Sequence, residues 1–244
     1  MSEQVRLAKY FTDCGVLSRR AAEEEIKKGR VKVNGIVAEL GQKITPGEDV
    51  VEYGGKRITP PKQAGKVYVM LNKPRGFVTT MSDEKGRPTV AMLTKSVGTR
   101  VYPVGRLDMD SSGLLLLTND GELANRLTHP RHDIPKIYHV LVAGHPTTAQ
   151  MTGLASPADL DGYITQPIRV RKLAEGEHET LLEMTLYEGR NRQIRRICEM
   201  QSLRVKQLVR VAIGELELGE LPEGKYTKLT NNQIAYLKGE RDHV

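Results

Sequence analysis

The chain has 244 residues, 39% hydrophobic and 27% charged, which allows one large soluble domain with a small second one. It has no apolar run of about 18 residues and no signal-peptide pattern at its start, so we expect neither a transmembrane helix nor secretion. Two cysteines, Cys14 and Cys198, cannot build a disulfide framework, which favours a cytoplasmic location, and a net charge of +7 favours an anionic partner.

Residues 1–60 are predicted to form a small domain of two helices and a hairpin. Apolar residues at helical spacing follow Val5, and Ser18 is a favourable N-cap for a second helix from Arg19 to Lys28. Asn34-Gly35 then joins two short strands, as is typical of a hairpin turn.

The small domain carries basic side chains that can converge on one side of it: Arg6, Lys9, Arg19, Arg20 and Lys32. Such a cluster suits contact with RNA phosphates. The alternative is a set of ordinary solvated charges.

A linker at residues 61–66, beside Pro60-Pro61, is expected to lead to a larger domain at 67–244. Strand patterns there outnumber helical ones without a regular strand–helix–strand repeat, so we predict an α+β domain around a mixed or antiparallel sheet. The predicted elements are strands at 67–72, 77–80, 101–104, 114–117, 136–142, 180–186, 204–211 and 213–218, and helices at 90–93, 122–127, 147–154, 192–201 and 231–238.

The stretch from Tyr102 to Gly121 combines a compact loop with a buried strand. The loop is Gly105-Arg-Leu-Asp108, and the apolar run Leu114–Leu117 is bounded by turn residues, which predicts a strand buried on both faces. A carboxylate and a guanidinium between core strands either present a reactive group or pin the loop through an internal ion pair. The local pattern leaves both interpretations open.

The predicted helix at 192–201, capped by Asn191, brings three arginines to one side near its N-terminal end: Arg192, Arg195 and Arg196. This arrangement suits a phosphate or a carboxylate, and the alternative is a solvated basic face. Arg195 lies close to the buried side of the helix, so it needs a carboxylate partner, for which Asp108 is the natural candidate.

Metal and cofactor sites find little support in the sequence. Asp108 and Asp110 suggest a Mg²⁺ pair, but no third carboxylate accompanies them, and the cysteines and histidines lack the spacing of a zinc site. Walker and dinucleotide-binding glycine patterns are absent from the sequence. We therefore expect no metal and no nucleotide cofactor.

Taken together, several spaced motifs resemble those of the pseudouridine synthases, in the RsuA/RluB/RluE/RluF branch whose members carry an N-terminal S4 RNA-binding domain. Ser18-Arg19 and Val33-Asn34-Gly35 are similar to the S4 pattern. The motifs of the larger domain are Lys73-Pro74-x-Gly76 (similar to motif I), Gly105–Asp108 with Ser112–Gly121 (motif II), Lys136-x-Tyr138 (the tyrosine motif), Glu188–Arg196 (motif III) and Val205–Arg210 (the strand after it).

The resemblance implies roles for individual residues. Asp108 would be the catalytic aspartate, Tyr138 would stack on the target uracil, and Arg195 would pair with Asp108. Substrate binding would involve Arg106, which helps to displace the base, Leu208, which lines the pocket, and further Lys73, Arg192, Gln193 and Arg196. The S4 resemblance adds Ser18 and Asn34 to the five basic residues predicted to contact RNA.

The resemblance further implies isomerisation of a specific uridine to pseudouridine in ribosomal RNA, with 23S favoured over 16S. The reaction needs no redox cofactor, metal or ATP, and the substrate would be free RNA or a pre-ribosomal particle. The target nucleotide must be flipped out of its stack, which costs a few kcal/mol and explains the basic surface. We expect a monomer. The alternatives are a non-catalytic rRNA-binding or assembly factor and an aspartate-dependent RNA hydrolase.

Overall fold

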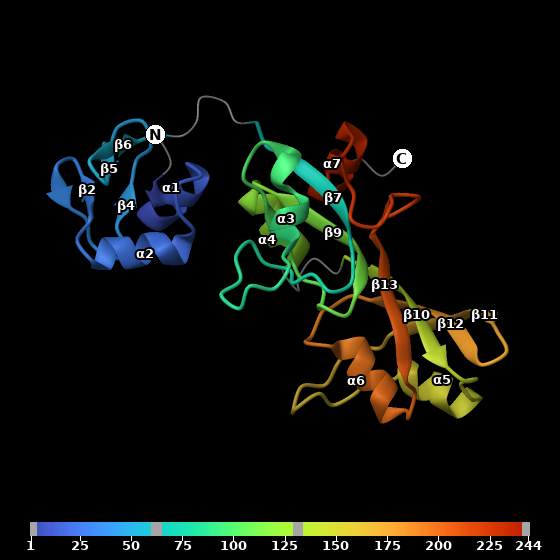
Figure 1. The fold of residues 1–244 in the computed structure, drawn as a ribbon. Helices are drawn as coiled ribbons and strands as arrows, with labels where there is room; N and C mark the ends of the chain where they lie inside the picture. Colours follow the sequence, from blue (N-terminus) through green and yellow to red (C-terminus); the bar gives the residue numbers. More distant parts are fainter. Residues whose placement is uncertain (1–3, 60–64, 129–133, 241–244) are drawn as a thin grey trace. The chain divides into compact units, whose positions relative to one another are not determined.

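The structure is a computed structural model that describes residues 4–59, 65–128 and 134–240. The chain divides into two compact units, Met1–Gly65 and Lys66–Val244 (Figure 1). Residues 61–64 of the predicted linker, like His129-Pro130 after the helix predicted at 122–127, lie outside the described residues.

The N-terminal unit packs two helices against short strands. The elements of this unit are β1 (Val5–Arg6), α1 (Leu7–Asp13), α2 (Arg19–Lys27), β2 (Val31–Val33), β3 (Ile36–Val37), β4 (Lys43–Ile44), β5 (Val51–Tyr53) and β6 (Lys56–Ile58). The strands form a β1-β4 pair and a four-stranded sheet in the order β3-β2-β5-β6. The predicted second helix and the hairpin are confirmed, and Ser18 caps α2 by accepting the N–H of Ala21 at 3.2 Å.

The larger unit is built on one nine-stranded sheet. The elements of this unit are β7 (Tyr68–Lys73), α3 (Val90–Leu93), the 3₁₀ helix η1 (Lys95–Val97), β8 (Tyr102–Val104), β9 (Ser112–Thr118), α4 (Gly121–Thr128), β10 (Lys136–Ala143), α5 (Thr148–Ala155), β11 (Arg169–Glu175), β12 (Glu179–Leu186), α6 (Gln193–Met200), β13 (Val205–Ile213), β14 (Leu216–Glu217), β15 (Tyr226–Lys228) and α7 (Asn231–Lys238). The sheet order is β11-β12-β10-β13-β9-β7-β15, with β14 beside β13 and β8 beside β9.

The sheet is mixed, as predicted. Strands β13 and β9 pair in parallel, whereas the other pairings are antiparallel. Helices α5 and α6 pack near the β10–β13 end, and α4 and α7 near the β9–β7 end (Figure 1). The predicted α+β class is therefore confirmed.

Strand β9 is the most buried element of the larger unit, because both of its faces contribute to a core. Leu114 and Leu116 pack with α4 and α7, whereas Leu115 and Leu117 pack with β7 and α3. Each buried leucine stabilises the fold by roughly 2 kcal/mol, so β9 is a rigid support for the loop that precedes it. The predicted two-sided burial is confirmed.

Two predicted strands differ from the structure. Residues 77–80 form no strand, because Val78 makes an isolated bridge with Thr89 and the Thr79 hydroxyl bonds to a loop instead. The strand predicted at 213–218 is interrupted at Gly214, whose φ of 57° turns the chain between β13 and β14.

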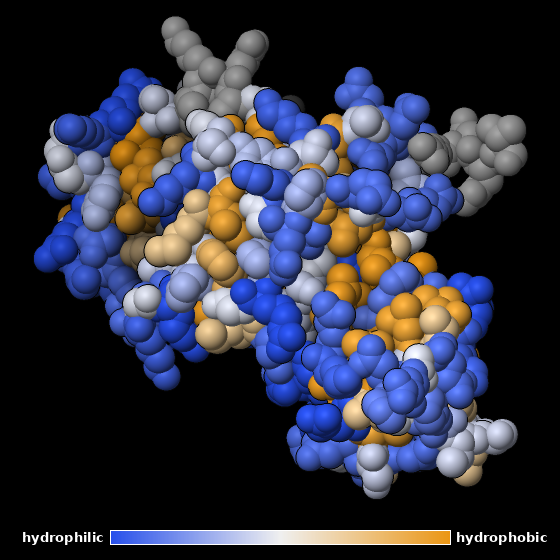
Figure 2. Space-filling model, turned by 45° about the vertical axis from the view of Figure 1, so that its right-hand side comes forward, coloured by the Kyte–Doolittle hydropathy of each residue, from blue (hydrophilic) through white to orange (hydrophobic). Residues whose placement is uncertain are grey.

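None of the helices in the three described ranges is long and apolar enough to cross a membrane. On the face drawn in Figure 2, hydrophilic residues predominate and hydrophobic residues lie in separate groups. Scattered apolar side chains of this kind are ordinary for protein surfaces.

Candidate active site

Four strands of the larger unit place a row of residues side by side. Lys73 on β7 pairs with Gly113 on β9, Gly113 pairs with Arg210 on β13, and Arg210 pairs with Tyr138 on β10. Gly113 has no side chain, so the position between Lys73 and Arg210 in this row carries none. The Gly105–Ser111 loop, which joins β8 to β9, lies next to this place.

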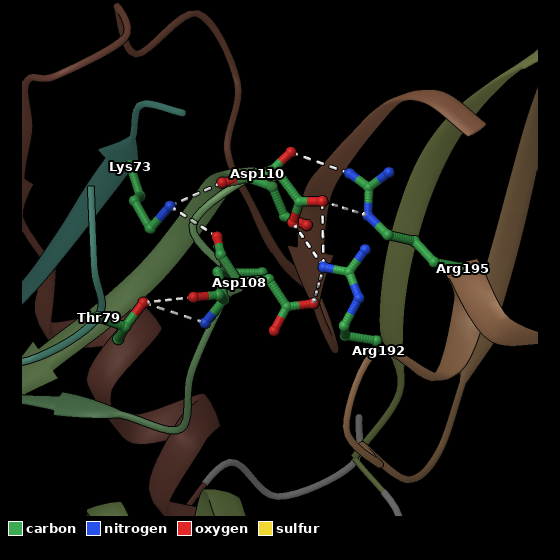
Figure 3. Close-up of polar contacts among 8 residues, drawn as sticks. Lys73, Thr79, Asp108, Asp110, Arg192 and Arg195 are labelled. Atoms are coloured by element: carbon green, nitrogen blue, oxygen red, sulfur yellow. Dashed lines mark hydrogen bonds and ion pairs between the residues drawn. The ribbon is translucent and has the colours of Figure 1, made fainter. Parts of the chain in front are cut away.

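Lys73 holds that loop through its backbone. Its ammonium, fully buried at the end of β7, donates to the carbonyl oxygens of Asp108 and Ser111 at 3.0 and 2.7 Å (Figure 3). It also donates to the carbonyl oxygen of Pro74 at 3.1 Å. Burial lowers the pKa of Lys73 to about 8, against the carboxylates of Asp108 and Asp110, which raise it. With three carbonyl partners and no exposed surface, Lys73 supports the loop from behind, and this geometry gives no support to the predicted contact of Lys73 with substrate.

A second side chain fixes the same loop one residue earlier. Thr79 Oγ1 donates to the carbonyl oxygen of Leu107 at 2.6 Å and accepts the Leu107 N–H at 3.2 Å (Figure 3). The Thr79 hydroxyl thus satisfies both backbone groups of a buried loop residue. The residue that follows, Asp108, is held in one orientation as a result.

The carboxylate that pairs with Arg195 is Asp110, which corrects the predicted pairing with Asp108. Arg195 Nη2 donates to the carbonyl oxygen of Asp110 at 2.9 Å, and Arg195 Nε lies 3.2 Å from Asp110 Oδ2 (Figure 3). Burial lowers the pKa of Arg195, whose side chain is 13% exposed, and the charge of Asp110 opposes that shift. Asp108 acts on Arg195 more weakly, from farther away.

Arg192 lies between the two carboxylates. Its Nη1 donates to both carboxylate oxygens of Asp110 at 3.1 Å and lies 3.9 Å from Asp108 Oδ2. Asp110 therefore neutralises two guanidinium groups, whereas Asp108, 31% exposed, keeps its carboxylate largely free of short contacts (Figure 3).

The start of α6 explains why Arg192 can reach the loop. Arg192, and not the predicted Asn191, is the N-cap residue, and it takes a left-handed conformation with φ 49°. The next side chain, Gln193, turns inward: it accepts the Arg190 N–H at 3.0 Å and donates to Glu188 at 2.9 Å. These bonds occupy Gln193, which is 3% exposed at the cavity wall.

The loop and α6 border a cavity of about 320 Å³. The residues lining it include Arg106, Asp108, Ser111, Lys136, Tyr138, Glu188, Arg190, Asn191, Arg192, Gln193, Leu208 and Arg210. A volume of this size is at the lower end of small-molecule sites and suits a single nucleobase with part of its sugar.

The cavity brings together most of the residues predicted to contact substrate. Tyr138 and Leu208 line it from β10 and β13, two pairs of residues apart in the register. Arg106 is exposed at the cavity and has no hydrogen-bond or ion-pair partner within the described ranges. Three predicted residues do not line it: Lys73, Arg195 and Arg196, the last of which donates to Asp161 at 2.9 Å.

The polar residues predicted for the N-terminal unit fall into two groups. Arg6, Arg19, Arg20 and Lys32 are exposed. The other three make contacts within the unit: Lys9 with Asp13 at 2.8 Å, Ser18 as the cap of α2, and Asn34 with Asp49 at 2.8 Å and the Val50 N–H at 2.9 Å.

Several residues at the cavity or behind its wall have no functional signal in the sequence. The sequence suggests only a metal-ligand role for Asp110 and no role for Thr79, Ser111, Glu188 or Arg210. Each acts through a contact between segments far apart in the chain, for which local spacing gives no signal. Among the residues that the structure describes, no group of three or more His, Cys, Asp or Glu side chains is placed to hold a metal ion.

Comparison with known proteins finds family models for both units and relatives that match nearly the whole chain. The family model described as RNA pseudouridylate synthase matches residues 67–200, and the S4 domain model matches residues 5–50. An RNA pseudouridine synthase of Aquifex aeolicus is 42% identical, over 96% of this chain and 94% of its own. Ribosomal large subunit pseudouridine synthase B of Bacillus subtilis is 41% identical, over 98% and 97%.

Two further matches agree with these. The dual-specificity RNA pseudouridine synthase RluF of Escherichia coli is 37% identical, over 96% of this chain and 78% of its own. A crystal structure of a pseudouridylate synthase superimposes with a TM-score of 0.67 at 31% identity, covering 96% of this chain and 99% of that one. The chain therefore belongs to the RNA pseudouridine synthase family of isomerases and carries an S4 domain in its N-terminal unit.

Proposed function

We propose that this protein isomerises one uridine of ribosomal RNA to pseudouridine, in the large subunit, with Asp108 as the reacting carboxylate. The observation that carries the proposal is the Asp108 side chain, which lines a cavity of base size while Asp110 engages the nearby arginines. The name of the Bacillus subtilis relative favours the large subunit. The protein would act as a cytoplasmic monomer on rRNA or a pre-ribosomal particle.

The surroundings of Asp108 suit the breaking and re-forming of a bond at C1′. Its carboxylate is partly exposed and lies 3.9 Å from the Arg192 guanidinium, so it faces the cavity with a positive charge beside it. Tyr138 and Leu208 offer apolar surface on which a uracil ring can stack while its bond to the sugar is broken. Arg106 could take the place of the flipped base or hold its phosphate.

The two units would divide the work. Residues 67–244 would carry out the reaction, and residues 1–60 would hold structured RNA through the exposed basic side chains of Arg6, Arg19, Arg20 and Lys32. Phosphate contacts of this kind position an RNA without reading its sequence.

The proposal is tested with unmodified 23S and 16S transcripts. Each is incubated with the protein, and pseudouridines are mapped by carbodiimide labelling and primer extension. We expect one new site in 23S RNA for the wild type, and no product above background for Asp108→Asn, at least roughly 10³-fold below wild type, with RNA affinity unchanged. No product from the wild type on either RNA would rule out the proposal.

Asp161→Asn is the matched control, because Asp161 pairs with Arg196 away from the cavity and its left-handed φ of 58° suits asparagine. It should retain wild-type activity. A non-catalytic binding factor would bind RNA but form no product with any variant, and an RNA hydrolase would cut the strand.

A further inference from the structure

Two polar groups at the cavity have no partner in the described structure. Arg210 is 5% exposed and Ser111 is 1% exposed, yet Arg210 Nη2 and Ser111 Oγ make no hydrogen bond with any described residue. Both residues line the cavity. Buried polar atoms are nearly always paired, so two unpaired ones at the same cavity indicate that a ligand completes them.

The Nε atom of Arg210 holds its guanidinium in place. Its Nε donates to the carbonyl oxygen of Leu114 at 2.8 Å, and no carboxylate within the described ranges forms an ion pair with it. The backbone of β13 also passes very close to Gly113, where a Cβ atom would lie 2.3 Å from the Arg210 carbonyl oxygen. Arg210 is therefore a fixed cation whose Nη2 cannot turn to another protein group without losing its bond to Leu114.

A second buried cation, Lys73, follows Arg210 in the row across the sheet, separated from it by Gly113. Burial lowers the pKa of Lys73, the charges of Asp108, Asp110 and Glu223 raise it, and repulsion by Arg210 lowers it further. Three carbonyl oxygens satisfy the Lys73 ammonium, whereas Arg210 Nη2 has no acceptor among the described residues, and a buried cation without a partner is costly. An electron-rich group in the cavity would supply that partner.

We propose that Arg210 Nη2 and Ser111 Oγ donate hydrogen bonds to the carbonyl oxygens of the flipped uracil and stabilise the negative charge that the base gains during isomerisation. The inference rests on the proposed function. Uracil offers two carbonyl acceptors on one rigid ring, and Tyr138, paired with Arg210 in the register, can stack on that ring at the same level. Arg210 and Ser111 then join Asp108 as residues that contact the reacting nucleotide.

The chemistry explains why a fixed cation is useful at this place. When the N1–C1′ bond breaks, both its electrons stay with the base, whose negative charge spreads onto the two carbonyl oxygens. After rotation, C5 supplies the electron pair of the new C5–C1′ bond, C5 loses its proton, and N1 gains one, so no atom is added or lost. Arg210 keeps all its protons throughout and acts as a pre-oriented donor toward developing charge.

The test uses a short RNA containing the uridine mapped above, with its O4 or its O2 replaced by sulfur. Sulfur is a poorer acceptor, so it weakens a hydrogen bond to the base without removing the base. Single-turnover rates at saturating protein are measured for wild type, Arg210→Gln, Arg210→Lys and Ser111→Ala, together with RNA affinity and the urea midpoint of unfolding.

We expect Arg210→Gln to lower the single-turnover rate by about 100-fold or more, with RNA affinity changed less than about threefold. Arg210→Lys, which keeps the charge, should recover part of the rate, and Ser111→Ala should lose about tenfold. Replacing one of the two uracil oxygens by sulfur should clearly slow the reaction of the wild type. The same replacement should slow the Arg210 variants little further, because they have already lost the hydrogen bond to that oxygen.

Ser112→Ala is the matched control for Ser111→Ala, since Ser112 is a buried neighbour that does not line the cavity. Its rate should equal that of the wild type. If the sulfur penalties in Arg210→Lys and in Ser111→Ala are the same as in the wild type, the inference is wrong even when the wild type is active. A wild type without product would instead refute the proposed function. Because Ser111→Ala removes a single oxygen atom, it decides the question even if the Arg210 variants do not fold.

Discussion

At the scale of single residues, the site separates two carboxylates that lie two positions apart. Asp110 accepts hydrogen bonds from Arg192 and pairs with Arg195, whereas the carboxylate of Asp108 has its nearest cation at 3.9 Å. Neighbouring acids in different surroundings take different roles. Asp110 therefore positions the arginines and leaves Asp108 available to a ligand in the cavity.

Lys73 provides a test at this scale, because its one ammonium satisfies three carbonyl oxygens. Lys73→Met fills a similar volume but leaves those oxygens unpaired, so it should lower the free energy of unfolding by roughly 3 kcal/mol and also reduce activity. Urea unfolding measures the first effect and single-turnover kinetics the second. A variant as stable as the wild type would contradict the supporting role.

The same variant tests a pH dependence. The pKa of Lys73 is about 8 in the folded protein against 10.5 for a free lysine, so between these values the unfolded chain holds more protons than the folded one. Over this window the free energy of unfolding contributed by Lys73 rises with pH. The stability difference between wild type and Lys73→Met should therefore widen from pH 8 to 10. If this stability difference narrowed instead, the pKa of Lys73 would not be lowered by folding.

At the scale of elements, the site depends on the close parallel approach of β9 and β13. Gly113 has φ 103°, and a Cβ there would lie 2.3 Å from the Arg210 carbonyl oxygen and 2.7 Å from the Arg210 nitrogen. Both are backbone atoms, which cannot move without separating the two strands. This approach fixes the relative position of the Asp108 loop and the Leu208–Arg210 wall of the cavity.

Gly113→Ala should accordingly destabilise the protein by more than about 3 kcal/mol, through both the contact and the strained φ. Gly98→Ala is a matched control: its φ is 80°, but no atom lies within 4 Å of the added Cβ, so only the conformational cost of roughly 1–2 kcal/mol remains. The two free energies of unfolding are compared by urea titration. Equal losses would contradict the role of the strand approach.

At the scale of the whole molecule, some exposed basic residues form ion pairs and others do not. Four basic residues of the N-terminal unit have no ion-pair partner within the described ranges: Arg6, Arg19, Arg20 and Lys32. By contrast, Lys28, the C-cap of the helix that begins at Arg19, pairs with Glu25 at 3.0 Å. Exposed unpaired cations suit RNA phosphates, since binding them releases counterions.

The triple variant Arg19→Ala, Arg20→Ala and Lys32→Ala should bind RNA more weakly. The slope of log affinity against log salt should fall in magnitude by roughly 2, because each lost phosphate contact removes about 0.7–0.9. The single-turnover rate at saturating protein should change little. Lys27→Ala with Lys28→Ala serves as the control, since both lysines are paired with glutamates. An unchanged salt slope in the triple variant would exclude these side chains from RNA binding.

The sequence by itself determined the elements whose signals are local. The apolar run in β9 required burial on both faces, Ser18 fixed the start of α2, and the motifs around Asp108, Tyr138 and Arg192 identified the family. These features depend on side-chain type and on spacing within a few residues, and the structure and the family match agree with them. The family of the larger unit can therefore be predicted from the sequence alone.

Only the tertiary structure decided which groups meet. Lys73 bonds to a carbonyl 35 positions away, Arg192 to a carboxylate 82 positions away and Arg210 to a carbonyl 96 positions away. The sequence predicted that Arg195 pairs with Asp108, whereas the structure pairs it with Asp110, because the choice depends on the left-handed turn at Arg192 and on strand register. Hydrogen bonds act over about 3 Å, and spacing along the chain does not fix distances between strands that accurately.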